Sequence, residues 1–184
     1  MDLRNKKIII LSHCLLNTNS KVAGFSPQIA GEQNLVSLIL SKGYGVMQLP
    51  CPENRIYGSK RWGQSREQFD TPHFRKECQK MLLPYIDEIL DYQKNGYEIT
   101  VIISVYGSPS CGYKASFSSN AYGGELDMST VQFQIASGKL SDSSGIFMEE
   151  FEMLLKASNL TIPFFNFMEE TPDKSFEILS DVLI

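Results

Sequence analysis

The chain has 184 residues, a formal charge of -4 at neutral pH and a pI near 5.2, which suits one domain, residues 1–184, that buries its own core. Net negative charge argues against a nucleic-acid polymer or an anionic membrane as partner, because a protein that binds either one needs clustered positive charge on its surface. The apolar run behind Lys7 is short, is interrupted by Ser12 and His13, and predicts a strand rather than a signal peptide. No segment approaches the roughly 20 apolar residues of a membrane span, so we expect a cytoplasmic protein with reduced thiols.

Segments with strand-like and helix-like periodicity alternate along the chain. The first is a continuous β-branched run, and the helical segment after it has Ser26 and Pro27 as a start signal. A later helical segment contains Pro84, where a helix can kink, and the last begins with Thr171 as a capping residue. In chain order, strands are expected over 7–11, 44–50, 98–106 and 162–168, and helices over 27–43, 74–96, 145–159 and from 171 onward.

This alternation predicts the fold class. Apolar strands separated by helices are typical of a parallel sheet that is covered on both faces. We therefore expect an α/β fold, a single-domain three-layer sandwich with a mostly parallel sheet of the Rossmann or flavodoxin-like kind. Two polar, glycine-containing stretches, 54–71 and 114–144, interrupt the pattern. Loops of this length in compact domains commonly carry function.

Three of the four cysteines follow a predicted strand. Cys14 comes after the first strand, Cys51 after the second and Cys111 after the third. Because ligands of open α/β sheets bind at the carboxyl ends of the strands, these three thiols are expected at one edge of the sheet. Cys78 lies inside a predicted helix, and we interpret it as a small, partly buried residue.

Three thiols at one edge indicate a site for a soft metal. Thiolates favour iron-sulfur clusters, zinc or cuprous copper. A closed zinc site needs a fourth ligand, for which His13 is the nearest candidate, although neighbours on a strand point to opposite faces unless the strand has ended. Three cysteines without a fourth suit a cubane cluster that leaves one iron open to substrate.

Polar residues beside the cysteines are candidates for binding and proton transfer. The hydroxyls of Ser108 and Ser110 can donate to cluster sulfur atoms or to a polar substrate. Glu53, two residues after Cys51, is a candidate acid, base or water-orienting residue. Trp62 can stack on a planar ring. Cations of the same stretch that can bind a polar substituent are Lys60, Arg61 and Arg66.

Taken together, "CLLN" from Cys14, "CPE" from Cys51 and "SPSCG" around Cys111 resemble the TudS-like thiouracil desulfidases. Members of that family carry Cys-Leu-Leu, Cys-Pro-Glu and Ser-Pro-Ser-Cys-Gly in this order on a small α/β domain. The resemblance extends over most of the chain, as far as "GIFMEEFEML", which is similar to the family's closing helix. It implies a 4Fe-4S cluster whose unique iron takes sulfur from a thiouracil-like thiolated nucleobase, or from a related small thioamide, in a non-redox hydrolysis.

The resemblance also implies roles for single residues. Carried over to the matching positions, the three motif cysteines would bind the cluster, with Glu53 and Ser108 as catalytic residues. Ser110 and Trp62 are predicted substrate contacts on the chemistry of their own side chains. The family commonly continues with glycine after its first motif and then an Arg-Tyr-Asp-Gly-like segment. This chain has "CLLNTNSKVAG" instead, which keeps Lys21 as a predicted substrate contact but has Ala23 in place of the acid. This protein can therefore share the cluster of the TudS-like family and act on a different substrate.

Two hypotheses from other classes stay open. Cys111 can act as a metal-free nucleophile for acyl or sulfur transfer, with His13 or His73 as its base. Such an enzyme would survive the loss of Cys14 and Cys51. Alternatively, the thiols form a metal or redox sensor that changes partner binding when they are modified.

Overall fold

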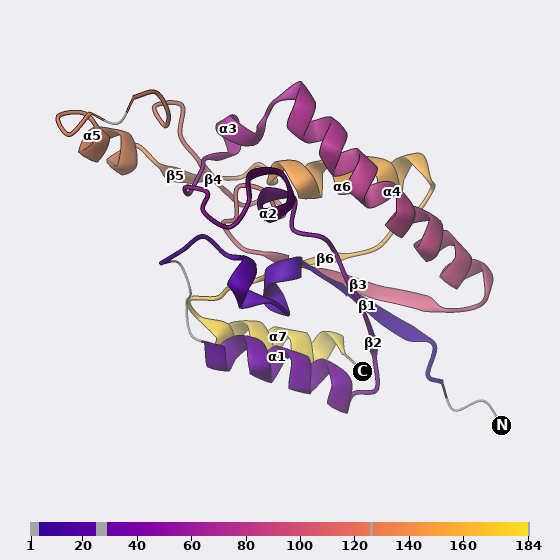
Figure 1. The fold of residues 1–184 in the computed structure, drawn as a ribbon. Coiled ribbons are helices and arrows are strands. Elements are labelled where there is room, and N and C mark those ends of the chain that lie inside the picture. The colour runs from indigo at the N-terminus through magenta and orange to yellow at the C-terminus, as the bar shows by residue number, and fades with distance from the viewer. Residues whose placement is uncertain (1–3, 25–28, 126, 184) are drawn as a thin grey trace.

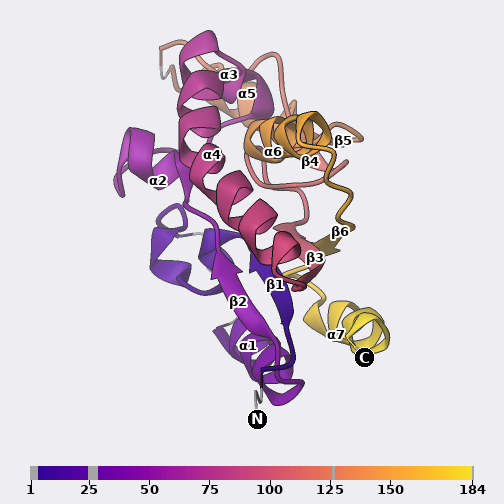
Figure 2. The same cartoon turned by 90° about the vertical axis from the view of Figure 1, so that its right-hand side faces the viewer.

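A computed structural model describes residues 4–24, 29–125 and 127–183, and it has the expected three-layer α/β architecture (Figure 1). Four parallel strands form the central sheet in the order β2-β1-β3-β6. Figure 2 shows the sheet between two helical layers, α4 with α6 and α1 with α7. The strands are β1 (Lys7–Leu11), β2 (Gly45–Gln48), β3 (Glu98–Val105) and β6 (Phe164–Phe167), and the helices are α1 (Ile29–Ser41), α4 (Pro72–Lys94), α6 (Ile146–Ala157) and α7 (Pro172–Val182).

Strand β1 lies at the centre of the sheet because both of its faces are apolar. Ile8 and Ile10 belong to the core cluster beneath α4 and α6, and Ile9 and Leu11 belong to the cluster beneath α1 and α7. Burying a side chain of this size stabilises the fold by about 1.5–3 kcal/mol. Leu11 pairs with Gln48 of β2 and with Ile103 of β3, so the carboxyl ends of these strands reach the same edge of the sheet.

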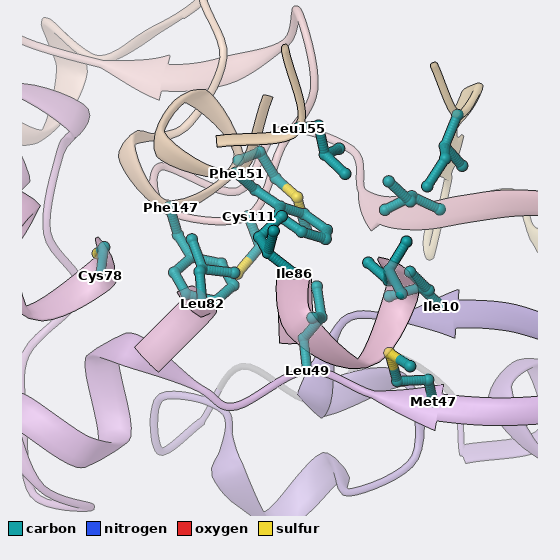
Figure 3. Packing of buried hydrophobic residues seen from close by; sticks show 14 of the residues in the cluster. Ile10, Met47, Leu49, Cys78, Leu82, Ile86, Cys111, Phe147, Phe151 and Leu155 are labelled. Atoms are coloured by element: carbon teal, nitrogen blue, oxygen red, sulfur yellow. The ribbon is translucent and has the colours of Figure 1, made fainter. Parts of the chain in front are cut away.

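A charged network connects α4 and α6. Glu150 is 1% exposed, and its carboxylate accepts hydrogen bonds from Arg75 (2.5 Å) and Gln79 (2.7 Å). Thr71 caps α4 by accepting from the backbone N–H of Phe74, and the helix continues through Pro84. Cys78 lies inside α4, as expected, is fully rather than partly buried, and lies well apart from Cys111 (Figure 3).

The two long polar stretches contain short elements that the sequence patterns did not predict. Their four to six residues per helix and three per strand are too few to set up a visible periodicity. Thr171 occupies the N-cap position of α7, but its side chain makes no capping hydrogen bond, and the start signal Ser26–Pro27 lies outside the described residues. The short elements are α2 (Pro52–Tyr57), α3 (Arg66–Phe69), α5 (Val131–Ala136), β4 (Ser116–Ser118) and β5 (Lys139–Ser141), and two 3-10 turns, η1 (His13–Leu15) and η2 (Thr18–Ser20), follow β1.

Among residues 4–24, 29–125 and 127–183, no helix is both long enough and apolar enough to cross a bilayer.

Candidate functional site

The three cysteines that follow strands lie in three loops at the carboxyl edge of the sheet. Cys14 lies in η1 behind β1, Cys51 is the N-cap residue of α2 behind β2, and Cys111 lies in the loop behind β3. All three are free thiols, and Cys111 is only 7% exposed. Figure 3 shows Cys111 among the buried apolar side chains beneath α4 and α6.

The loop that carries Cys111 is fixed by backbone contacts that require glycine. The N–H of Gly112 donates to the carbonyl of Ser108 at 2.9 Å, and a Cβ on Gly112 would lie 1.9 Å from the carbonyl oxygen of Ala115. The first N–H groups of α6 donate to the carbonyls of Pro109 and Ser110. Since those N–H groups have no partners within the helix, this loop also completes the start of α6.

Side chains connect the Cys111 loop with the Cys51 loop. The Ser110 hydroxyl donates to Oε1 of Glu53 and also lies 3.4 Å from Sγ of Cys111. The other carboxylate oxygen of Glu53 accepts from Nε of Arg61 at 3.0 Å. Arg61 in turn donates to the carbonyl of Ser20 at 2.7 Å, and its side chain is 4% exposed. A continuous chain of polar contacts therefore runs from Cys111 across the edge of the sheet.

A second charged pair lies beside Cys14. Lys21 Nζ is 2.6 Å from Oε1 of Glu169, and these side chains are 7% and 9% exposed. Glu169 follows β6 by two residues, so the fourth strand of the sheet also contributes to this edge. Both groups act electrostatically on Cys14, Glu169 raising the thiol pKa and Lys21 lowering it.

Burial dominates the electrostatics of the thiols. It raises the pKa of Cys14, Cys51 and Cys111 above the usual value, because desolvation disfavours the thiolate. Charge on Cys51 and Cys14 raises the pKa of Cys111 further. The N–H of Asn54, 3.4 Å from Sγ of Cys51, acts in the opposite direction. The three thiols are thus close enough to influence one another and would gain from a positively charged partner.

Ser108, Trp62 and the predicted cations differ in their surroundings. The Ser108 hydroxyl accepts from the N–H of Cys111 at 3.0 Å, which stabilises the turn. Trp62 is 77% exposed between α2 and α3. Of the predicted cations, Arg61 pairs with Glu53, and Arg66 pairs with Glu149 and Asp70.

The histidines are not bonded to a cysteine in the described part of the chain. Nδ1 of His13 lies 3.2 Å from the carbonyl of Leu49, and Nε2 lies 3.3 Å from the amide of Asn17. His73 is exposed at the start of α4. Within residues 4–24, 29–125 and 127–183, no three His, Cys, Asp or Glu side chains converge on a point that would hold one metal ion.

Two polar residues of the site, Glu169 and Asn166, were not predicted from the sequence. Glu169 follows a predicted strand in the same way as the cysteines, so the strand-end rule would have found it. Asn166 in β6 accepts from the N–H of Tyr113 at 3.0 Å and donates to the carbonyl of the same residue, which holds the chain behind Cys111. No sequence pattern around Asn166 predicts its contact with Tyr113.

The fold and the site together define a class, a small α/β protein with three thiols at the carboxyl edge of a parallel sheet. The chain belongs to the family described as putative 2-thiouracil desulfurase, which matches residues 6–178. The uncharacterized protein MJ0003 of Methanocaldococcus jannaschii is 36% identical over 109 residues, which cover 59% of this chain and 69% of that protein. No solved structure matches the chain. The family match confirms the resemblance seen in the three cysteine motifs.

Proposed function

We propose that the protein is a desulfidase that exchanges sulfur for oxygen in a small thiocarbonyl compound of the thiouracil type, with a 4Fe-4S cluster held by Cys14, Cys51 and Cys111. The family description supports the desulfurase activity. One observation carries the proposal for the site: three free cysteines lie at one edge of the sheet, and charge on two of them raises the pKa of the third. Soft thiolates in this number suit a cluster with one open iron.

The donor set fits a cluster better than a single ion. A single zinc ion would need its sulfur ligands to converge at about 2.3 Å from one point. A cubane spreads its thiolate ligands over different iron atoms, so the three sulfur atoms need not converge. Its iron atoms would also supply the positive charge that favours the thiolate form of three thiols whose pKa values desolvation raises.

The reaction balances without electron transfer. A thiocarbonyl and water give a carbonyl and hydrogen sulfide, and the carbon keeps its oxidation state. When bound, the cluster would supply an iron that acts as a Lewis acid toward the substrate sulfur. The protein's own residues must then bind the ring, orient a water molecule and accept its proton.

Glu53 is the residue best placed to orient the water. Ser110 and Arg61 each occupy one oxygen of its carboxylate, which fixes the plane of the group. Each carboxylate oxygen has two lone pairs, so room is left for a water proton on both. Lys21, held near Cys14 by its ion pair with Glu169, remains the predicted contact for a polar ring substituent.

The metal-free alternative has less support. A cysteine nucleophile needs a base within hydrogen-bond reach. His13 uses its two ring nitrogens toward Leu49 and Asn17, and His73 is exposed on α4. Cys111 is buried, and its pKa is raised well above the usual value, which disfavours an activated thiolate without a cationic partner.

The test is turnover of 2-thiouracil by anaerobically reconstituted protein, with uracil and sulfide measured together. Glu53→Gln keeps the shape of the side chain and removes its basicity, so turnover should fall at least about 100-fold while iron content stays unchanged. Glu125→Gln, at an exposed carboxylate, is the matched control and should keep full turnover. Cluster-loaded protein that releases neither uracil nor sulfide would contradict thiouracil as substrate and favour the sensor hypothesis.

A further inference from the structure

The hydroxyl of Ser12 is buried without a hydrogen-bond partner. Ser12 is 1% exposed, and its Oγ has no partner among the described residues. A buried hydroxyl of this kind normally costs stability, because the hydrogen bonds it makes to water in the unfolded chain are not replaced. Most buried polar side chains in native proteins have a partner, so an exception needs a reason.

The position of Ser12 supplies that reason. Ser12 directly follows β1, and its N–H still donates to the carbonyl of Ile103 in β3 at 3.0 Å. On the other side of β1, the N–H of Leu49 donates to the carbonyl of Leu11 at 2.8 Å. Ser12 therefore lies at the end of the central strand, between the strand that leads to Cys51 and the strand that leads to Cys111.

The alternation of side chains along β1 also shows on which face of the sheet the Ser12 side chain lies. Ile8 and Ile10 belong to the core cluster beneath α4 and α6, and that cluster includes Cys111. Ser12 has extended backbone angles, φ -57° and ψ 142°, and continues this alternation on the same face as Ile10. Cys14, two residues further on, is packed against the opposite cluster. The hydroxyl thus lies on the same face of the sheet as Cys111, at the carboxyl edge where the loops with Cys14 and Cys51 also begin.

We infer that Ser12 is a positioning residue of the metal centre, whose hydroxyl donates a hydrogen bond to a sulfur atom of the iron-sulfur group held by the three cysteines. The inference rests on the function proposed above. Hydrogen bonds to cluster sulfur atoms stabilise and tune such centres, and loss of a supporting residue of this kind typically costs 10–100-fold in metal affinity.

The inference predicts opposite effects of one substitution in the metal-free and the loaded protein. Ser12→Ala removes an unpaired buried hydroxyl, so the melting temperature of the metal-free protein should rise by about 2–4 °C. The same variant should lose iron to a chelator 10–100-fold more readily than the wild type. Ser104→Ala is the matched control, because the buried Ser104 hydroxyl has partners in the carbonyl of Phe165 (3.0 Å) and Oδ1 of Asn166 (2.7 Å). That variant should melt lower in the metal-free state.

The outcomes separate this inference from the proposed function. If the wild type takes up iron and Ser12→Ala is destabilised in the metal-free state like Ser104→Ala, the hydroxyl serves the protein itself and the inference is wrong. If Ser12→Ala holds iron as tightly as the wild type, the inference is also wrong, and the proposed cluster stands. A wild type that takes up no iron overturns both.

Discussion

Replacing Gly112 by alanine should destroy the metal site without unfolding the protein. The added Cβ would lie 1.9 Å from the carbonyl oxygen of Ala115 and 2.8 Å from that of Ser108. Ordinary van der Waals contact begins near 3.4 Å, so the first pair must separate by about 1.5 Å. Both neighbours are backbone atoms of the loop that holds Cys111, and they cannot rotate away as a flexible side chain would.

The magnitude of this effect follows from the required displacement. Overpacking typically costs about 1–3 kcal/mol, which is less than the stability of about 5–15 kcal/mol usual for a folded domain. A shift of 1 Å at a reacting centre can cost about 100-fold in rate. Gly112→Ala should therefore melt lower, keep its far-UV circular dichroism spectrum and lose at least about 100-fold of its desulfidase turnover.

The control for this experiment is Gly63→Ala. A Cβ on Gly63 would meet nothing within 4 Å, so the variant should match the wild type or be slightly more stable. Melting curves, iron content after reconstitution and turnover are measured for all three proteins. Wild-type iron content and turnover in Gly112→Ala would refute the reasoning, because the loop would then tolerate a displacement that the contacts forbid.

Three further predictions concern the supports of the site. Glu150→Ala should lower the free energy of unfolding by about 3 kcal/mol in urea titrations, because loss of the buried carboxylate removes the acceptor of Nη1 of Arg75 and of the Gln79 amide; an unchanged midpoint would contradict this. Hydrogen bonds from Arg75 lower the pKa of Asp70. The ionised Asp70 therefore contributes fully to the free energy of unfolding above its unfolded-state pKa near 3.9, and this contribution is lost as pH falls through its lower folded-state pKa. The stability difference between wild type and Asp70→Asn should therefore be constant from pH 5 to 7 and shrink below about pH 4, and a difference that grows on acidification would have the wrong sign. Asn166→Ala removes both contacts to Tyr113 and should speed amide hydrogen exchange at that residue, whereas unchanged exchange would show that the loop is held elsewhere.

The sequence predicted the layers of the fold because the strands are strongly patterned. The β-branched run from Lys7 to Leu11 and the apolar segment of β3 have few alternatives to buried strands. The same reasoning placed Cys14, Cys51 and Cys111 behind their strands, since parallel strands share one carboxyl edge. The periodicity of these segments thus carries most of the information about where the site lies.

The contacts within the site depend on how separate loops meet, which local patterns do not encode. Arg61 is one of three cations that the sequence offers for a polar substituent, and its ion pair with Glu53 was not predicted, because α2 and the loop behind it bring the two side chains together. The unpaired hydroxyl of Ser12 likewise becomes visible only when every neighbouring donor and acceptor is placed. Short elements such as α3, four residues long, are stabilised by such contacts rather than by their own propensity.

The most direct test of the account is the iron and sulfide content after anaerobic reconstitution of the wild type and four cysteine variants. The account predicts about four iron atoms per chain in the wild type and in Cys78→Ala, and loss of the cluster in Cys14→Ala, Cys51→Ala and Cys111→Ala. Cys78→Ala is the matched control, because Cys78 is buried within α4 and does not lie in a loop behind a strand. A wild type that excludes iron, or a Cys51→Ala variant that keeps the full cluster, would contradict the three-thiolate site.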